Sequence, residues 1–344
     1  MLPGETLEQY VNRLVAEAPL SMSLSRAFPT SLPAWQAELK TQLLQLLGLS
    51  PEQRPSVEAE VKGEEEAAGY LRRYLYLHRS DGVTIPAYLL LPGADNAAES
   101  RCPGLLAVHG HGMGKVVVAG VKKDWRGRDV PQNPDDDYGV QGALRGYVTL
   151  IPDQVGFGEL MFEEDLRGDA GSSCMQLSMR LLAAGHTTIG QRVLEAMVCL
   201  DYLSSLPQVD ATRLAIMGLS GGGTTALFTG AIDDRLWATV VCGYLCTFRA
   251  SILAMAHCVC NYVPHILDFM EMYDIAALTA PRLLYIISGI HDPIFPMPGV
   301  EEAMRYLRRV YEAYGAPENL GRYDGPEGHR FYSAEVWDWL AERL

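Results

Sequence analysis

Apolar positions recur with two different spacings along the chain, and each spacing indicates a different kind of element. Residues 1–50 show amphipathic helical patterns, for example from Ala34 to Leu47, where five leucines crowd one side. Two β-rich runs, Tyr70 to His78 and Ile85 to Leu91, flank an Asp-Gly turn, which is typical of a hairpin. These patterns predict an N-terminal helical extension, over about residues 1–55, followed by antiparallel edge strands.

From about residue 104, short apolar runs alternate with helical patterns. The predicted strands cover residues 105–108, 147–151, 213–217, 238–244, 283–288 and 319–323. The predicted helices begin near residues 138, 189, 224, 300 and 334. Such alternation implies a mostly parallel sheet with helices on both faces. We therefore expect the α/β fold class, with one large domain over residues 56–344.

Two segments interrupt this alternation. Gly112 to Asp137 is rich in Lys, Asp, Gly and Pro, and Leu245 to Ala280 is rich in Met, Cys, His and Tyr. Both follow the carboxyl ends of predicted strands, where ligands bind in open α/β sheets. We expect these insertions, at about 112–137 and 245–280, to form the walls or the lid of a binding site.

Composition and charge limit the possible partners. The 344 residues are 48% hydrophobic and 20% charged, which suits one globular core. The formal net charge of -14 disfavours nucleic acids and anionic membranes, because both are negative. Residues Met1 to Glu8 lack a signal-peptide pattern, and no apolar run approaches a membrane span. We expect a cytoplasmic protein with a small-molecule partner; homo-oligomerisation is left open.

The seven cysteines form an odd set, and most lie in apolar stretches. Cys199 falls in the helix predicted from residue 189, and Cys242 falls in the predicted strand 238–244. This distribution favours buried, reduced thiols over a disulfide framework.

The main chemical signal is the sequence Gly218-Leu219-Ser220-Gly221-Gly222, which stands between an apolar strand and a helix of small residues. A serine on so sharp a strand-to-helix turn needs small neighbours. The start of the helix directs free amides and its positive dipole end at a reacting carbonyl. The pattern therefore predicts that Ser220 is a nucleophile for acyl transfer.

A serine hydroxyl needs a base and an orienting carboxylate, which are expected downstream in the order Ser, Asp, His. Asp292 follows an apolar strand, and His329 lies in a loop before the last helix, so these two are expected to complete the triad. Asp268 and Asp274 are weaker alternatives for the acid. The histidines on the hairpin, before a helix or in the second insertion fit the base less well: His78, His186, His257 and His265.

An oxyanion hole requires backbone amides that stabilise the charge formed in the transition state. The sequence His109-Gly110-His111-Gly112 follows the predicted strand 105–108, at the position from which one such amide comes in this architecture. We expect the two donors to be the amides of His111 and Gly221, with Gly112 as the alternative to His111.

His109 and His111 could also share a metal ion with His257, Cys258 and Cys260. The H-x-H and H-C-x-C spacings lack the separated ligand pairs of familiar zinc sites, and the His-Gly turn already has a role. The sequence therefore predicts no metal site and no cofactor.

Five motifs stand in a fixed order along residues 70–335: HGHG at 109–112, PDQVGFGE at 152–159, GLSGGG at 218–223, HCVCNYVP at 257–264 and DPIFP at 292–296. Together they resemble the α/β-hydrolase superfamily, and more narrowly its bacterial acetyl xylan esterase and dienelactone-hydrolase-like branch. The resemblance implies an α/β-hydrolase domain over residues 56–344 that hydrolyses carboxylic esters through an acyl-enzyme. It assigns the triad to Ser220, Asp292 and His329.

Two of these motifs are expected to be structural. The 152–159 segment shapes the turn after a central strand, with Glu159 in a structural role, and the 257–264 segment is a lid or pocket element with packed thiols. The expected substrates are short, acetyl-type esters, possibly of acetylated sugars. The alternatives are a peptidase or thioesterase that uses the same triad, and a non-catalytic binding protein that keeps the fold.

Overall fold

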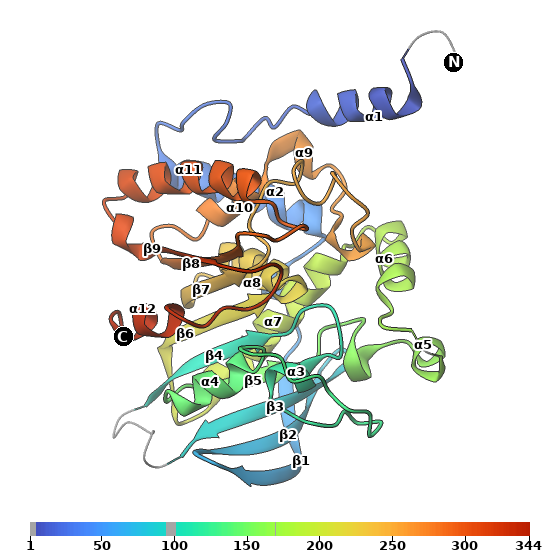
Figure 1. Cartoon of the computed structure of the whole chain (residues 1–344), viewed down its shortest axis with the longest axis vertical. Helices are drawn as coiled ribbons and strands as arrows, with labels where there is room; N and C mark the ends of the chain where they lie inside the picture. Colours follow the sequence, from blue (N-terminus) through green and yellow to red (C-terminus); the bar gives the residue numbers. More distant parts are fainter. Residues whose placement is uncertain (1–4, 94–100, 169) are drawn as a thin grey trace.

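The computed structural model describes residues 5–93, 101–168 and 170–344, and these residues form a single nine-stranded sheet with helices around it (Figure 1). The strands are β1 Val57–Ala67, β2 Tyr70–Arg79, β3 Thr84–Pro92, β4 Cys102–Val108, β5 Val148–Pro152, β6 Val209–Leu219, β7 Leu236–Cys242, β8 Leu283–Gly289 and β9 Leu320–Gly325. Their order in the sheet is β1-β2-β3-β5-β4-β6-β7-β8-β9. The pairs β1-β2, β2-β3 and β3-β5 are antiparallel, and the other five neighbouring pairs are parallel. The mostly parallel α/β sheet expected from the alternating pattern is confirmed.

Helices cover both faces of the sheet (Figure 1). The helices of the described residues are α1 Leu7–Ala16, α2 Leu32–Leu47, α3 Lys115–Val118, α4 Tyr138–Leu144, α5 Glu163–Arg167, α6 Cys174–Ala183, α7 Thr188–Ser205, α8 Gly221–Ile232, α9 Ile266–Phe269, α10 Met272–Ala277, α11 Met297–Ala313 and α12 Val336–Ala341. Alternate side chains of β4 point to opposite faces, as the strand period requires. Leu106 and Val108 join a core with α2, α7, α8, α10 and α11, whereas Leu105 and Ala107 join one with α4 and α12.

The antiparallel strands lie at the N-terminal edge of the sheet, as expected, but the structure adds β1 outside the predicted hairpin. The pattern of apolar positions did not predict β1 because its side chains are mostly exposed and its sequence is rich in glutamate. Pairing with β2 places Glu64 opposite Arg73 and Glu65 opposite Arg72, and both pairs form salt bridges. Cross-strand charge pairs and backbone hydrogen bonds therefore replace an apolar face in this strand.

The two N-terminal helices differ in how they contact the rest of the chain. Leu39, Leu43 and Leu47 of α2 are fully buried, and Gly48 ends the helix in the left-handed conformation that glycine favours. In contrast, α1 has no buried residue. None of the described helices is both long enough and apolar enough to span a bilayer.

A buried ion-pair network fastens the turn after β5 to the first insertion. The Lys115 side chain is almost inaccessible, and its Nζ lies 2.7 Å from Asp153 Oδ2 and 2.5 Å from Glu159 Oε1. Tyr74 donates its hydroxyl hydrogen bond to Glu159 Oε2 over 2.7 Å. The Asp153 carboxylate also accepts from the amides of Lys115 and Glu159. These contacts give Glu159 a structural place in the fold, in line with the sequence-based expectation.

Replacing Lys115 with methionine should lower the free energy of unfolding by about 3 to 5 kcal/mol, because the buried carboxylate of Asp153 and the partly buried one of Glu159 lose their counter-charge. Urea denaturation followed by tryptophan fluorescence measures the effect. Lys123→Met is the matched control: Lys123 pairs with Asp129 at 2.7 Å on the exposed surface, so the change should stay within about 0.5 kcal/mol. Equal unfolding midpoints for the two variants would contradict this prediction.

Candidate active site

Ser220 stands at the junction of β6 and α8 in a strained backbone conformation, with φ 57 and ψ -117. Its amide donates to the carbonyl oxygen of Cys242 over 2.9 Å, which fastens the turn to the end of β7. A Cβ on Gly222 would lie 2.0 Å from the carbonyl oxygen of Val108, so only glycine allows α8 to approach β4 this closely. The sharp strand-to-helix turn predicted from the sequence is therefore present, with Ser220 at its tip.

The structure brings Asp292 and His329 together. Asp292 follows β8 and His329 follows β9, and His329 Nδ1 lies 2.7 Å from Asp292 Oδ2. A carboxylate can only accept, so Nδ1 carries the proton and Nε2 is left with a free lone pair. His329 and Ser220 line one cavity. This is the geometry that a general base and its orienting carboxylate would require.

The second carboxylate oxygen of Asp292 is held by backbone amides. Asp292 Oδ1 accepts hydrogen bonds from the amides of Ile294 and Phe295, at 2.8 and 3.1 Å. These two bonds hold the carboxylate in one orientation. The ring of Phe295 also stacks on the His329 imidazole, with the ring centres 5.7 Å apart.

The weaker candidates have other partners. The Asp274 carboxylate is buried and accepts from the amides of Leu24 and Glu271, so it belongs to the cap of α10. Asp268 contacts the exposed His265 at 2.8 Å. Three other histidines also have partners. His78 contacts Glu60 and Thr84, His186 contacts the Gly48 carbonyl oxygen, and His257 contacts Ser251. Of these, only His257 lines the same cavity as Ser220.

The amides expected to form an oxyanion hole lie close to Ser220. Gly221 begins α8, so its N–H has no partner within the helix. Within the described part of the chain, neither the Gly221 amide nor the His111 amide donates to a protein acceptor. His111 also packs against Gly221, where a Cβ would lie 2.7 Å from His111 Nδ1. The geometry leaves both amides free to bind an anion.

His109 has a purely structural arrangement. Its Nε2 accepts from the Gln154 amide at 3.0 Å, and its Nδ1 lies 2.7 Å from the Gly110 carbonyl oxygen. Burial lowers the pKa of His109 to about 4, so the ring is neutral at neutral pH, as an accepting Nε2 requires. Because both ring nitrogens are engaged, His109 connects β4 to the turn after β5.

The cavity above Ser220 has a volume of about 690 Å³, within the usual range for small-molecule sites. Both insertions contribute to its walls, with Asn133, Pro134 and Asp136 from the first and residues 255–258 and 261 from the second. Apolar side chains include Leu219, Ile294 and Phe295, and Arg330 adds a positive charge. Both insertions thus lie where ligands were expected to bind.

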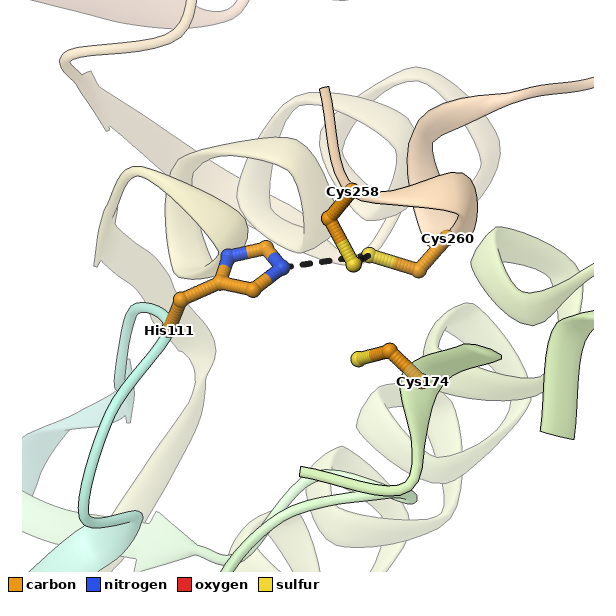
Figure 2. A group of neighbouring side chains, drawn as sticks. All are labelled: His111, Cys174, Cys258 and Cys260. Atoms are coloured by element: carbon orange, nitrogen blue, oxygen red, sulfur yellow. Dashed lines mark hydrogen bonds between the residues drawn. The ribbon is translucent and has the colours of Figure 1, made fainter. Parts of the chain in front are cut away.

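Beside this cavity, four potential metal ligands converge from three parts of the chain: His111, Cys174, Cys258 and Cys260 (Figure 2). One ligand atom from each lies within 4.8 Å of the others. His111 Nε2 is 3.2 Å from Cys260 Sγ, and the sulfurs of Cys258 and Cys260 are 3.3 Å apart. All seven cysteines are free, as expected, but these thiols form a cluster and are not simply packed in the core.

The sequence-based argument against a metal considered a different set of ligands. The structure excludes His109 and His257 from this cluster and adds Cys174, which begins α6. Nothing in the local spacing marks Cys174, because it is far from the other three in the sequence. The sequence signal that could have indicated this metal site was the H-C-x-C motif at residues 257–260 together with His111 after β4.

The comparisons with known proteins agree with this architecture. Residues 11–336 match the Abhydrolase family. A Bacillus subtilis (strain 168) protein, YtaP, provisionally assigned as a hydrolase, is 30% identical over 300 residues, which cover 86% of this chain and 94% of YtaP.

Solved structures also share the fold. A provisionally assigned acetyl xylan esterase from Bacteroides fragilis has a TM-score of 0.84 at 19% identity, over 100% of this chain and 97% of that one. A glucuronoyl esterase from Solibacter usitatus has a TM-score of 0.68 at 17% identity, over 99% and 97%. At these identities the likeness establishes the fold.

Proposed function

Since this chain belongs to the Abhydrolase family, we propose that it hydrolyses carboxylic esters with Ser220, His329 and Asp292 as its catalytic triad. The observation that carries the proposal is the 2.7 Å contact between His329 and the buried Asp292, with His329 and the strained Ser220 lining the same cavity. Such a constellation is identified by its geometry and roles.

In this mechanism, His329 Nε2 takes the proton of Ser220 as the hydroxyl oxygen attacks the ester carbonyl carbon. The amides of His111 and Gly221 stabilise the negative oxygen of the tetrahedral intermediate. His329 then returns the proton to the departing alcohol, which leaves an acyl group on Ser220. Water, deprotonated by His329, releases the acid and restores the serine.

We further propose short acyl esters of small polyhydroxylated alcohols, such as acetylated sugars, as substrates. The cavity combines apolar side chains near Ser220 with the polar groups of Asn133, Asp136 and Arg330. Apolar walls suit a short acyl chain, and polar groups suit hydroxyls of the alcohol part. Two of the proteins that share the fold are named as an acetyl xylan esterase and a glucuronoyl esterase, and both names denote esters of carbohydrates.

The substrate class is tested by assaying the purified protein with p-nitrophenyl esters of increasing acyl length, an acetylated monosaccharide, an acetyl thioester and an aminoacyl amide. We expect the highest kcat/KM for acetyl or propionyl esters and measurable release of acetate from the sugar. Faster turnover of the amide or the thioester would favour the peptidase or thioesterase alternative and overturn the ester assignment.

A further inference from the structure

We propose that His111, Cys174, Cys258 and Cys260 bind a structural zinc ion at the wall of the cavity. The proposal concerns the cluster itself and does not depend on the reaction at Ser220. Its basis is the convergence of three sulfurs and one imidazole nitrogen, which Figure 2 shows pointing toward one another.

The spacing of the four atoms fits a single zinc ion. Zinc–sulfur bonds of about 2.3 Å in a tetrahedral site place ligand atoms roughly 3.7 Å from one another. The observed distances lie on both sides of that value. Cys260 Sγ lies 3.2 Å from His111 Nε2 and 3.3 Å from Cys258 Sγ, and all four ligand atoms lie within 4.8 Å of one another. A small contraction or expansion of the side chains would complete the coordination.

The ligand types select the metal. Three thiols and one imidazole are soft or borderline ligands, which suit zinc and do not suit magnesium or calcium. Cys174 and Cys260 are each 2% exposed, and they pack with Phe157. A disulfide would engage two of the sulfurs and leave the third thiol and the imidazole without a partner. A zinc ion explains all four groups.

The charge around the cluster supports the same occupant. Arg192 is 2% exposed, and its Nη2 lies 3.3 Å from Cys174 Sγ. Across the described ranges, no carboxylate forms an ion pair with Arg192, whose guanidinium otherwise contacts the Val155 carbonyl oxygen at 3.3 Å and the Phe157 ring with its centre 5.0 Å away. Thiolate sulfurs would place negative charge directly beside this buried cation. Zinc binding releases the three thiol protons, and the resulting centre carries one net negative charge beside the guanidinium.

Four protein ligands fill a tetrahedral site, so this zinc holds structure and does not bind substrate. It would tie the loop after β4 to the start of α6 and to the second insertion. His111 also presents one of the amides assigned to the oxyanion hole, so the ion would fix that amide. This last consequence rests on the proposed function, whereas metal binding does not.

The test is the metal content of the full chain, purified under reducing conditions with added ZnCl2 and then desalted. Elemental analysis should find about one zinc ion per chain in the unaltered protein and in Ser220→Ala. Cys174→Ser and Cys258→Ser should each lose most of it. Cys199→Ser is the matched control, because Cys199 is fully buried in α7 and lies outside the cluster.

Cobalt provides a readout that does not depend on protein yield. Adding Co2+ to the metal-free protein should produce thiolate-to-cobalt charge-transfer absorption, which weakens in Cys258→Ser, a variant at a half-buried position. Circular dichroism checks that each variant is folded. Absence of zinc and of the cobalt signal in the folded, reduced protein would overturn the proposal, as would equal zinc loss in Cys199→Ser.

The metal site and the esterase proposal can fail separately. A protein that binds zinc through these four residues but hydrolyses no ester would retain the metal site and refute the function. An active esterase that binds no zinc would support the proposed function and refute the metal site. If both hold, removing zinc with a chelator should lower kcat more than it raises KM, because the oxyanion donor acts in the transition state.

Discussion

Replacing Ser220 with alanine should lower kcat for p-nitrophenyl acetate by at least about a thousandfold. The variant lacks the hydroxyl that forms the acyl-enzyme, while the cavity and the amides of His111 and Gly221 stay in place. The hydrogen bond from the amide of residue 220 to the Cys242 carbonyl oxygen does not involve the side chain, so the variant retains it. Steady-state assays at saturating substrate measure the loss.

A fluorophosphonate probe gives an independent measurement on the same residue. We expect mass spectrometry to find one adduct, on Ser220, and none in Ser220→Ala. Ser205→Ala, at the end of α7, is the control and should keep both the activity and the adduct, because the Ser205 hydroxyl donates to the nearby Tyr202 carbonyl oxygen. Undiminished hydrolysis by Ser220→Ala would refute Ser220 as the nucleophile, whereas no adduct on the unaltered protein would support the non-catalytic alternative.

Replacing Asp292 with asparagine should lower kcat roughly ten-thousandfold, since the effect arises from the protonation state of His329. Asparagine can keep its oxygen toward the amides of Ile294 and Phe295, where Asp292 Oδ1 now accepts. Its NH2 group then faces His329 Nδ1 in place of Oδ2. Two donors cannot face each other, so the neutral imidazole would carry its proton on Nε2 and could not accept one from Ser220.

This substitution separates a catalytic role from a structural one. The thermal midpoint of Asp292→Asn should stay close to that of the unaltered protein, because the loop bonds are conserved. Asp268→Asn is the matched control: its carboxylate contacts exposed His265, so kcat should not change. A small loss of kcat in Asp292→Asn, comparable to that in Asp268→Asn, would refute Asp292 as the orienting acid.

The proposed zinc site and the proposed oxyanion hole meet at His111. Its ring points toward the three sulfurs (Figure 2). Its backbone amide donates to no protein acceptor within the described residues, and its ring packs against Gly221. A metal that restrains this loop would reduce the reorganisation needed when negative charge forms on the substrate oxygen. A zinc ion at this position in the cavity wall would therefore link the stability of the fold to the geometry of the proposed reaction.

The sequence by itself determined the features that depend on local spacing. The alternation of short apolar runs with helices predicted the central sheet, and glycines around Ser220 predicted the turn, because both patterns reflect backbone geometry over a few residues. Asp292 and His329 were inferred from the expected order Ser, Asp, His. Their positions after predicted strands added support, because the carboxyl ends of parallel strands share one edge. The edge strand β1 lacked such a pattern, since its charges are paired across the sheet.

Tertiary structure alone decided which distant side chains meet. Cys174 lies in neither insertion, and only the packing of α6 against the second insertion brings its sulfur to Cys258 and Cys260. The ion pairs of the buried Lys115 were also not predictable from local spacing, because its partners Asp153 and Glu159 lie on the turn after β5. Apolar periodicity records which face of an element is buried, but a metal site or a buried ion pair depends on three-dimensional convergence, which no local spacing encodes.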